Sequence, residues 1–153
     1  AVDSIFMMPQ LGVLSTIHPK AATEVFHKDC LIHLGTSVTP AGQGKPGSST
    51  GEYKITMPDG EIHKGELTYG DMKKFDLPVE ETAQLVFEPN RGFDVGRGSG
   101  KKLEAKIHGG VVGIILDGRG RPLEIPGESA DRVKALKNWL TSLEVYPEGA
   151  LQG

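Results

Sequence analysis

Between residues 52 and 125 the chain is a succession of short strand-like segments separated by turns that are rich in glycine. These segments are EYKITM, EIHKGELT, AQLVFEP, KKLEAKIH and VVGIILDG, which begin at residues 52, 61, 83, 101 and 111. Runs of this length with apolar and β-branched residues, bounded by glycine and proline, are typical of strands. No helical segment lies between them to connect parallel neighbours. The sequence therefore predicts a mainly β fold, an antiparallel barrel or sandwich.

Two segments outside this region have the apolar spacing of amphipathic helices. One covers residues 19–29, where Pro19 suits a first helical position. The other covers residues 129–143, where Ser129 suits an N-cap. We expect both short helices to pack on the β-structure, because isolated helices of this length are marginal in water.

The expected domain order has four parts. Residues 1–39 form an extended segment, a helix and a strand; residues 40–51 form a linker or mobile loop; residues 52–145 form a β-domain with a C-terminal helix; and residues 146–153 form a tail. In an alternative α+β arrangement, the strand at Leu31 to Thr39 extends a sheet that upstream chain completes. The chain begins at Ala1, which suggests a piece of a longer protein.

The apolar run from Ile5 to Ile17 contains Pro9 and Gly12, which disfavour a helix of any length. We predict extended, buried chain there. When upstream chain is absent this run is exposed, so we expect a homo-oligomer that associates through it.

Charge and cysteine content restrict the partners. The 17 basic and 20 acidic side chains give a net charge of -3, which offers no reason to expect a nucleic acid partner. No apolar run approaches the ~20 residues needed to cross a bilayer, so no membrane partner is expected. Cys30 is the single cysteine, cannot form an internal disulfide, and is interpreted as a small core residue. A cytoplasmic protein is expected.

The turn from Asp94 to Lys101 (DVGRGSGK) invites comparison with a phosphate-binding loop. The spacing fails, because Val95 stands where the first glycine is required and Lys102 where serine or threonine is required. A glycine-rich turn or bulge between two strands is the simpler interpretation. The five histidines have no ligand spacing either. We therefore expect no catalytic, cofactor or metal site in this chain.

A second turn follows the strand at residue 111 and contains Arg119 and Arg121 (DGRGRP). Two arginines at a strand end can grip a carboxylate or a phosphate, or they can be solvated or pair with acidic neighbours. Gly109 and Gly110 are interpreted as a tight hairpin before that strand. We predict a basic partner-binding surface from Arg97, Lys101, Lys102, Arg119 and Arg121. The alternative is a small enzyme in which these arginines and His108 form an anion-binding site.

Three segments carry a resemblance to a known family: GVLSTIHPKAATEVFHKDCLIHLGTSVTPAG, FDVGRGSGKKLEAKIHGGVVGIILDGRGRPLEIP and RVKALKNWLTSL. Together they resemble the C-terminal part of the accessory proteins encoded beside glutamate mutase, the MutL/GlmL type. The resemblance implies an actin-like ATPase-fold chaperone that maintains or reactivates an adenosylcobalamin-dependent mutase. It implies that ATP binds only in a missing upstream domain, and that this chain is a non-catalytic interaction domain whose partner is a subunit of the mutase.

Overall fold

A computed structural model describes residues 12–26, 32–123 and 125–144. The chain divides into two compact units, Ala1–His33 and Leu34–Gly153. The predictions for Ile5 to Leu11, for Cys30 and for the tail at residues 146–153 lie outside the described residues.

The first unit is helical where it is described. Residues 12–17 form a helical turn, and α2 follows at Pro19–Val25. The prediction of extended, buried chain is therefore wrong for residues 12–17, where Val13 and Ile17 are 64% and 65% exposed. Gly12 lies within the described helical residues, and Pro19 begins α2, a position where proline does not break a helix. The helix predicted at residues 19–29 is present as far as Val25.

The described residues of the second unit form seven strands and one helix. The strands are β1 (Gly35–Val38), β2 (Ser49–Thr56), β3 (Ile62–Thr68), β4 (Met72–Phe75), β5 (Thr82–Pro89), β6 (Leu103–His108) and β7 (Gly113–Asp117), and the helix is α3 (Ser129–Ser142). One sheet has the order β1-β7-β4 and the other has the order β3-β2-β5-β6. The mainly β prediction is confirmed. The two sheets do not close into a barrel.

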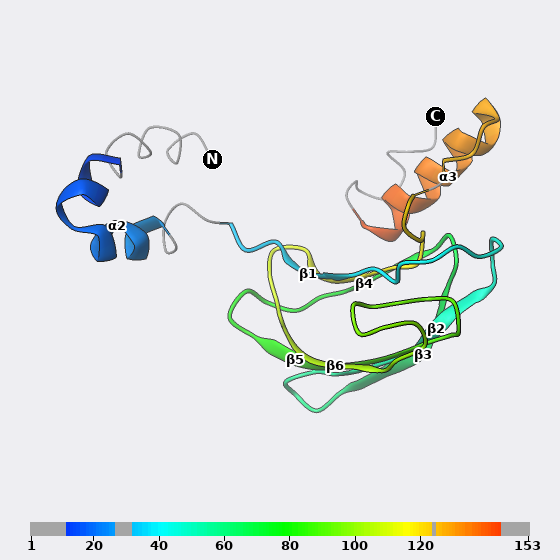
Figure 1. Cartoon of the computed structure of the whole chain (residues 1–153), viewed down its shortest axis with the longest axis horizontal. Coiled ribbons are helices and arrows are strands. Elements are labelled where there is room, and N and C mark those ends of the chain that lie inside the picture. The colour runs from blue at the N-terminus through cyan, green and yellow to red at the C-terminus, as the bar shows by residue number, and fades with distance from the viewer. Residues whose placement is uncertain (1–11, 27–31, 124, 145–153) are drawn as a thin grey trace. The chain divides into compact units, whose positions relative to one another are not determined.

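One hydrophobic core joins the two sheets. Ile55, Leu85 and Phe87 of the four-stranded sheet are almost fully buried, and they cluster with Ile114 and Leu116 of β7. The alternating burial of β2 and β5 shows that one face of that sheet is turned inward. The inner faces therefore pack in two layers, as the ribbons in Figure 1 show.

β7 is the central strand of the smaller sheet. It pairs antiparallel with β4 and parallel with β1, in the register Gly35 to Gly113. β1 therefore finds its partner strand within this chain. The α+β alternative, in which upstream chain completes the sheet of β1, does not describe this structure. The expected hairpin at Gly109 and Gly110 is also wrong, because β6 pairs with β5 and β7 belongs to the other sheet. The two glycines instead carry the chain between the sheets, where a side chain at Gly109 would collide with the Pro78 carbonyl.

The segment predicted to be a linker or mobile loop, residues 40–51, is part of the second unit. Pro40 and Thr50 are among its most buried residues, and the Thr50 hydroxyl donates a hydrogen bond of 2.8 Å to the Leu67 carbonyl. β2 already begins at Ser49. Composition did not reveal this packing, because a proline and a threonine can be buried when their polar groups find partners.

The connections and the helix differ from expectation in small ways. The turn at Pro58 to Gly60 is present, closed by a 2.8 Å bond from the Met57 amide to the Glu61 carbonyl. β4 was not predicted, because its sequence MKKF places two lysines in a short edge strand. The N-cap of α3 is Glu128 and not Ser129.

Among the described residues there is no helix with both the length and the apolar character needed to cross a membrane.

Candidate functional site

Asp117 is the last residue of β7 and the most buried charged residue among those described. Its side chain is 3% exposed. Since Ile114 and Leu116 point into the core, Asp117 lies on the opposite face of the sheet. The chain leaves the strand there through Gly118, where a side chain would collide with the Thr68 carbonyl. A buried carboxylate at a strand end requires donors close at hand.

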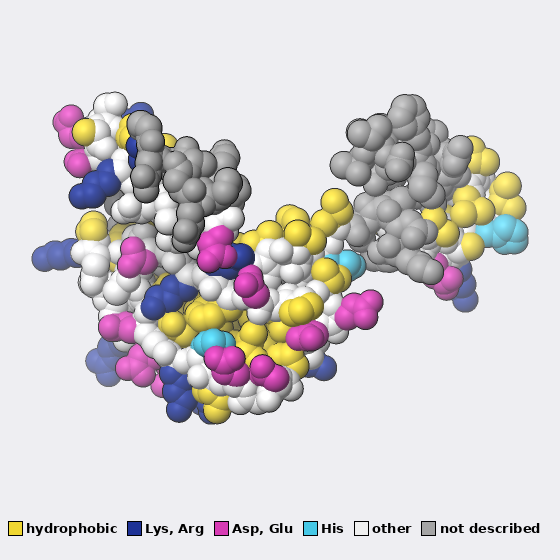
Figure 2. All heavy atoms as spheres, turned by 180° about the vertical axis from the view of Figure 1, so that it is seen from behind, with side chains coloured by type: hydrophobic (Ala, Val, Ile, Leu, Met, Phe, Trp, Pro, Cys, Tyr) yellow, Lys and Arg dark blue, Asp and Glu magenta, His cyan; other side chains and the backbone are white. Residues whose placement is uncertain are grey.

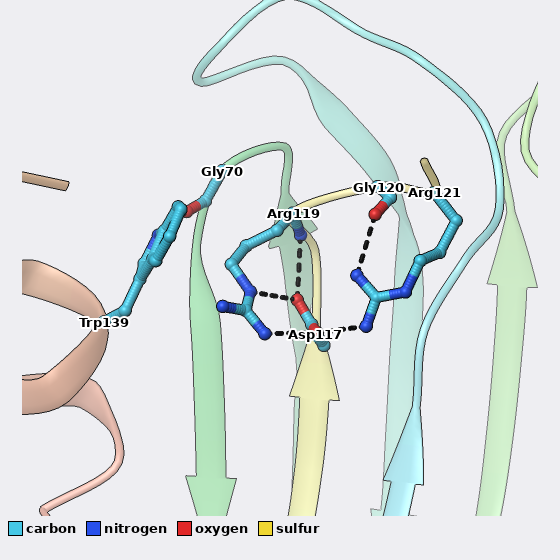
Figure 3. A network of polar contacts seen from close by, with 6 residues as sticks. All are labelled: Gly70, Asp117, Arg119, Gly120, Arg121 and Trp139. Carbon is cyan, nitrogen blue, oxygen red and sulfur yellow. Dashed lines mark hydrogen bonds and ion pairs between the residues drawn. The ribbon is translucent and has the colours of Figure 1, made fainter. Parts of the chain in front are cut away.

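Those donors come from the turn that follows (Figure 3). The Arg119 amide and Nε donate to Asp117 Oδ1 at 3.1 and 2.8 Å, and Nη2 of Arg119 donates to Oδ2 at 2.8 Å. Arg121 adds a bond of 3.1 Å from Nη2 to Oδ2, and its Nη1 donates to the Gly120 carbonyl. The carboxylate is held from two directions, and the bidentate pairing with Arg119 is the stronger geometry.

This arrangement fixes the charge of the cluster. Burial works to raise the pKa of Asp117, but the hydrogen bonds and charges of Arg119 and Arg121 outweigh it and the pKa is lowered. The hydrogen bond to Asp117 in turn raises the pKa of Arg119. Asp117 is therefore ionised at neutral pH, and with two arginines around one carboxylate the cluster keeps a net positive charge.

Trp139 of α3 covers this cluster from the side. The Arg119 guanidinium carbon lies 4.7 Å from the centre of its ring, and the Trp139 Nε1–H donates to the Gly70 carbonyl at 3.0 Å. Beside them is a pocket of about 440 Å³, lined on other sides by Pro46 and Tyr69. The Tyr69 hydroxyl is buried and has no hydrogen-bond partner among the described residues. The pocket combines aromatic walls with a cation, a suitable environment for one side chain of a partner.

The other predicted turn, at Asp94, is satisfied locally. Asp94 Oδ1 accepts hydrogen bonds from the amides of Gly96, Arg97 and Gly98 at 2.7, 3.0 and 2.9 Å. Hydrogen bonds from the Gly98 and Gly96 amides lower the pKa of Asp94. The Asp94 side chain thus stabilises the turn that it begins, and the segment is a glycine-rich turn as the simpler interpretation expected.

The two turns are held next to each other by two consecutive residues. Ala41 bridges to Asp94, and Gly42 bridges to Arg121. The Ala41 and Asp94 backbones exchange hydrogen bonds of 2.7 and 2.9 Å. A loop that sequence analysis treated as a linker therefore joins the two basic turns.

The five predicted partner-binding residues do not form one free surface. Arg119 and Arg121 bind Asp117, and Lys102 forms ion pairs with Glu104 at 2.8 Å and Glu88 at 3.5 Å. Arg97 and Lys101 are exposed and have no ion-pair partner among the described residues. The structure thus holds the two turns next to each other but gives their basic residues different partners.

His108 lies away from the arginines. The carbonyl of His108 accepts the Thr36 hydroxyl at 2.8 Å, and Thr36 pairs with Ile114 near the start of β7, whereas Arg119 follows the end of that strand. The geometry therefore gives no support to an enzyme site built from His108 and the arginines.

Trp139 was missed as a site residue, although its place beside the apolar stripe of its helix is a signal that sequence analysis can use. Within the described ranges, no group of three or more His, Cys, Asp and Glu side chains has the arrangement of a metal site.

Comparisons with protein-family models, with curated proteins and with solved structures found no match to this chain.

Proposed function

We propose that this chain is a non-catalytic interaction domain of a chaperone or reactivating factor that serves an adenosylcobalamin-dependent mutase. This is the function that the family resemblance implies. The observation that carries the proposal is that, within the second unit, residues 34–42 of the first resembling segment meet the other two segments. β1 pairs with β7, Ala41 bridges to Asp94, and Arg119 stacks on Trp139. Residues 34–42 thus come together with the second and third segments, which follow about 50 residues later, and form one continuous region of the second unit.

The partner surface that we propose is centred on the loop at residues 91–101. Arg91, Arg97 and Lys101 are exposed there and form no ion pair with any described residue. The Arg121 side chain, 44% exposed, lies on the neighbouring turn. Loops held by a rigid sheet are common binding sites, and exposed cations favour an acidic patch on the mutase subunit. The pocket beside Trp139 receives a side chain of the same partner.

Binding of the chain to a purified adenosylcobalamin-dependent glutamate mutase tests the proposal. Biolayer interferometry with the immobilised chain is expected to show saturable binding that weakens as NaCl rises from 50 to 300 mM (about a twofold change in Debye length). The double variant Arg97→Glu/Lys101→Glu is expected to bind about tenfold more weakly at the lower salt concentration.

Lys106→Glu is the matched control, because Lys106 is an exposed lysine of β6. This charge reversal is expected to leave binding unchanged. Arg119 and Arg121 are unsuitable for the test, since both neutralise a buried carboxylate. Absence of saturable binding contradicts the mutase as partner, and equal losses in the double variant and the control contradict the basic loop as its site.

A further inference from the structure

The two sheets leave an open side between their edge strands β3 and β4. A groove of about 710 Å³ lies there, and we call it the β3–β4 groove. Its floor contains Met57, His63 and Phe75, and its rim contains Asp59, Glu61 and Glu81. Figure 2 shows a hollow on this side of the molecule in which hydrophobic side chains lie among acidic and basic ones, with a histidine at the border.

The floor is mainly aromatic and packs against the core. The Phe75 ring packs edge-on against Tyr53 with ring centres 5.6 Å apart, and His63 lies 5.3 Å from Phe75. Met57 and Phe75 are partly buried against the main hydrophobic core. A floor that is continuous with the core holds its shape before a ligand arrives, which lowers the entropic cost of binding.

The rim carries excess negative charge. Lys74, the lysine of the groove, is bound to Asp76 at 3.0 Å and to Glu144 at 2.7 Å. Hydrogen bonds to Glu144 and Asp76 raise its pKa. Asp59, Glu61 and Glu81 are exposed, and none of them pairs with a lysine or arginine among the described residues; Glu61 approaches only His63, at 3.6 Å. Lys73, whose Nζ lies 5.4 Å from the centre of the Tyr53 ring, is the cation near the floor without an ion pair among the described residues, so the carboxylates of the rim outnumber it.

We propose that the β3–β4 groove binds a basic segment of a partner protein, with an aliphatic or aromatic side chain on the Phe75 floor and lysines or arginines beside the Asp59, Glu61 and Glu81 carboxylates. An apolar anchor flanked by complementary charge is the usual composition of such a contact. This surface is opposite in charge to the basic loop at residues 91–101. The inference does not depend on the mutase proposal, and each can fail while the other holds.

Fluorescence anisotropy with labelled synthetic peptides tests the groove on the full chain. The probe peptide carries lysines on both sides of a Phe-Leu pair. One comparison peptide replaces the lysines by glutamates, and another replaces Phe-Leu by Gly-Ser. Only the first peptide is expected to bind saturably at 50 mM NaCl. The Glu61→Gln/Glu81→Gln variant is expected to bind it about fivefold more weakly, with a smaller difference at 300 mM NaCl.

The control variant is Glu52→Gln/Glu66→Gln, which removes two exposed carboxylates from cross-strand neighbours of β2 and β3. It is expected to bind as the unmodified chain does. All four positions are exposed, so both variants are expected to have the melting temperature of the unmodified chain. Thermal unfolding followed by circular dichroism checks this. Equal binding by the acidic peptide, or equal losses in both variants, overturns the proposal. Self-association that Glu61→Gln/Glu81→Gln abolishes assigns the groove to a second copy of the chain and also overturns it.

Discussion

Two turns of this protein are built from aspartate, glycine and arginine and have different physical roles. The Asp94 turn (residues 94–98) reads DVGRG and the Asp117 turn (residues 117–121) reads DGRGR. In both, the aspartate Oδ1 accepts the amide of the residue two positions later. Asp94 receives its other hydrogen bonds from backbone amides, whereas Asp117 receives them from two guanidinium groups.

The difference follows from burial. The Asp94 turn lies on a loop, where the carboxylate needs only its own turn and water. The Asp117 turn ends a strand with buried neighbours on both sides, where an anion needs opposite charge as well as hydrogen bonds. An arginine in the first turn remains available to a partner, and an arginine in the second stabilises the fold.

Removing the carboxylates tests this difference most directly. Asp117→Ala leaves Arg119 and Arg121 without their anion, so we expect a loss of about 3 kcal/mol in the free energy of unfolding. Asp94→Ala is expected to cost clearly less, because its amides reach water. Urea unfolding followed by circular dichroism measures both. Similar midpoints for the two variants would show that burial does not separate the turns.

The two arginines of the Asp117 turn are expected to be unequal. Arg119 binds both carboxylate oxygens and is 19% exposed, whereas Arg121 makes one bond to Asp117 and is 44% exposed. Arg119→Ala is expected to lose about 1.5–3 kcal/mol, the range for hydrogen bonds to charged groups, and Arg121→Ala less. Arg119→Lys is not expected to restore the loss, since lysine cannot bind bidentately. Full rescue by lysine, measured in the same unfolding assay, contradicts the role of the fork geometry.

The sequence predicts most of the strands but not how they are shared between sheets. Alternation marks β2 and β5 because one face of each is buried, and the turn chemistry at Pro58 to Gly60 marks the hairpin. The pairing of β1 with β7 depends on contacts between residues about 80 positions apart, and no local pattern specifies it. β4 was missed because its apolar residues are too few to show a period.

The sequence predicted some residues of the candidate site but not what each of them does. Sequence analysis identified Arg119 and Arg121 and left open whether they bind a partner or pair with acidic neighbours. The answer depends on the exposure of Asp117, which is set by the packing around β7. The ion pairs of Lys102 combine a local partner, Glu104, with Glu88 of the neighbouring strand, and only the first could be expected from the sequence.

Acid is expected to weaken the Asp117 turn. The pKa of Asp117 is lowered in the folded chain, so its contribution to stability is fully present above the unfolded value of about 3.9 and is lost as pH falls through the lower folded value. The stability difference between the unmodified chain and Asp117→Asn is therefore expected to shrink below about pH 4. Urea midpoints between neutral and strongly acid pH measure it. A difference that stays constant over this range contradicts the ionised state of Asp117.

The smallest expected effect concerns the contact between the Asp117 turn and α3. Trp139→Phe keeps a ring over Arg119 but removes the hydrogen bond to the Gly70 carbonyl, which costs about 0.5–1.5 kcal/mol. Arg97→Ala in the Asp94 turn is the matched variant and is expected to leave the unfolding midpoint unchanged, because its exposed side chain has no ion-pair partner among the described residues. Unfolding of both variants is followed by circular dichroism, because Trp139→Phe removes the single tryptophan and with it the tryptophan fluorescence signal. A loss in Arg97→Ala as large as that in Trp139→Phe would mean that both turns stabilise the fold through their arginines, and the division between them would be withdrawn.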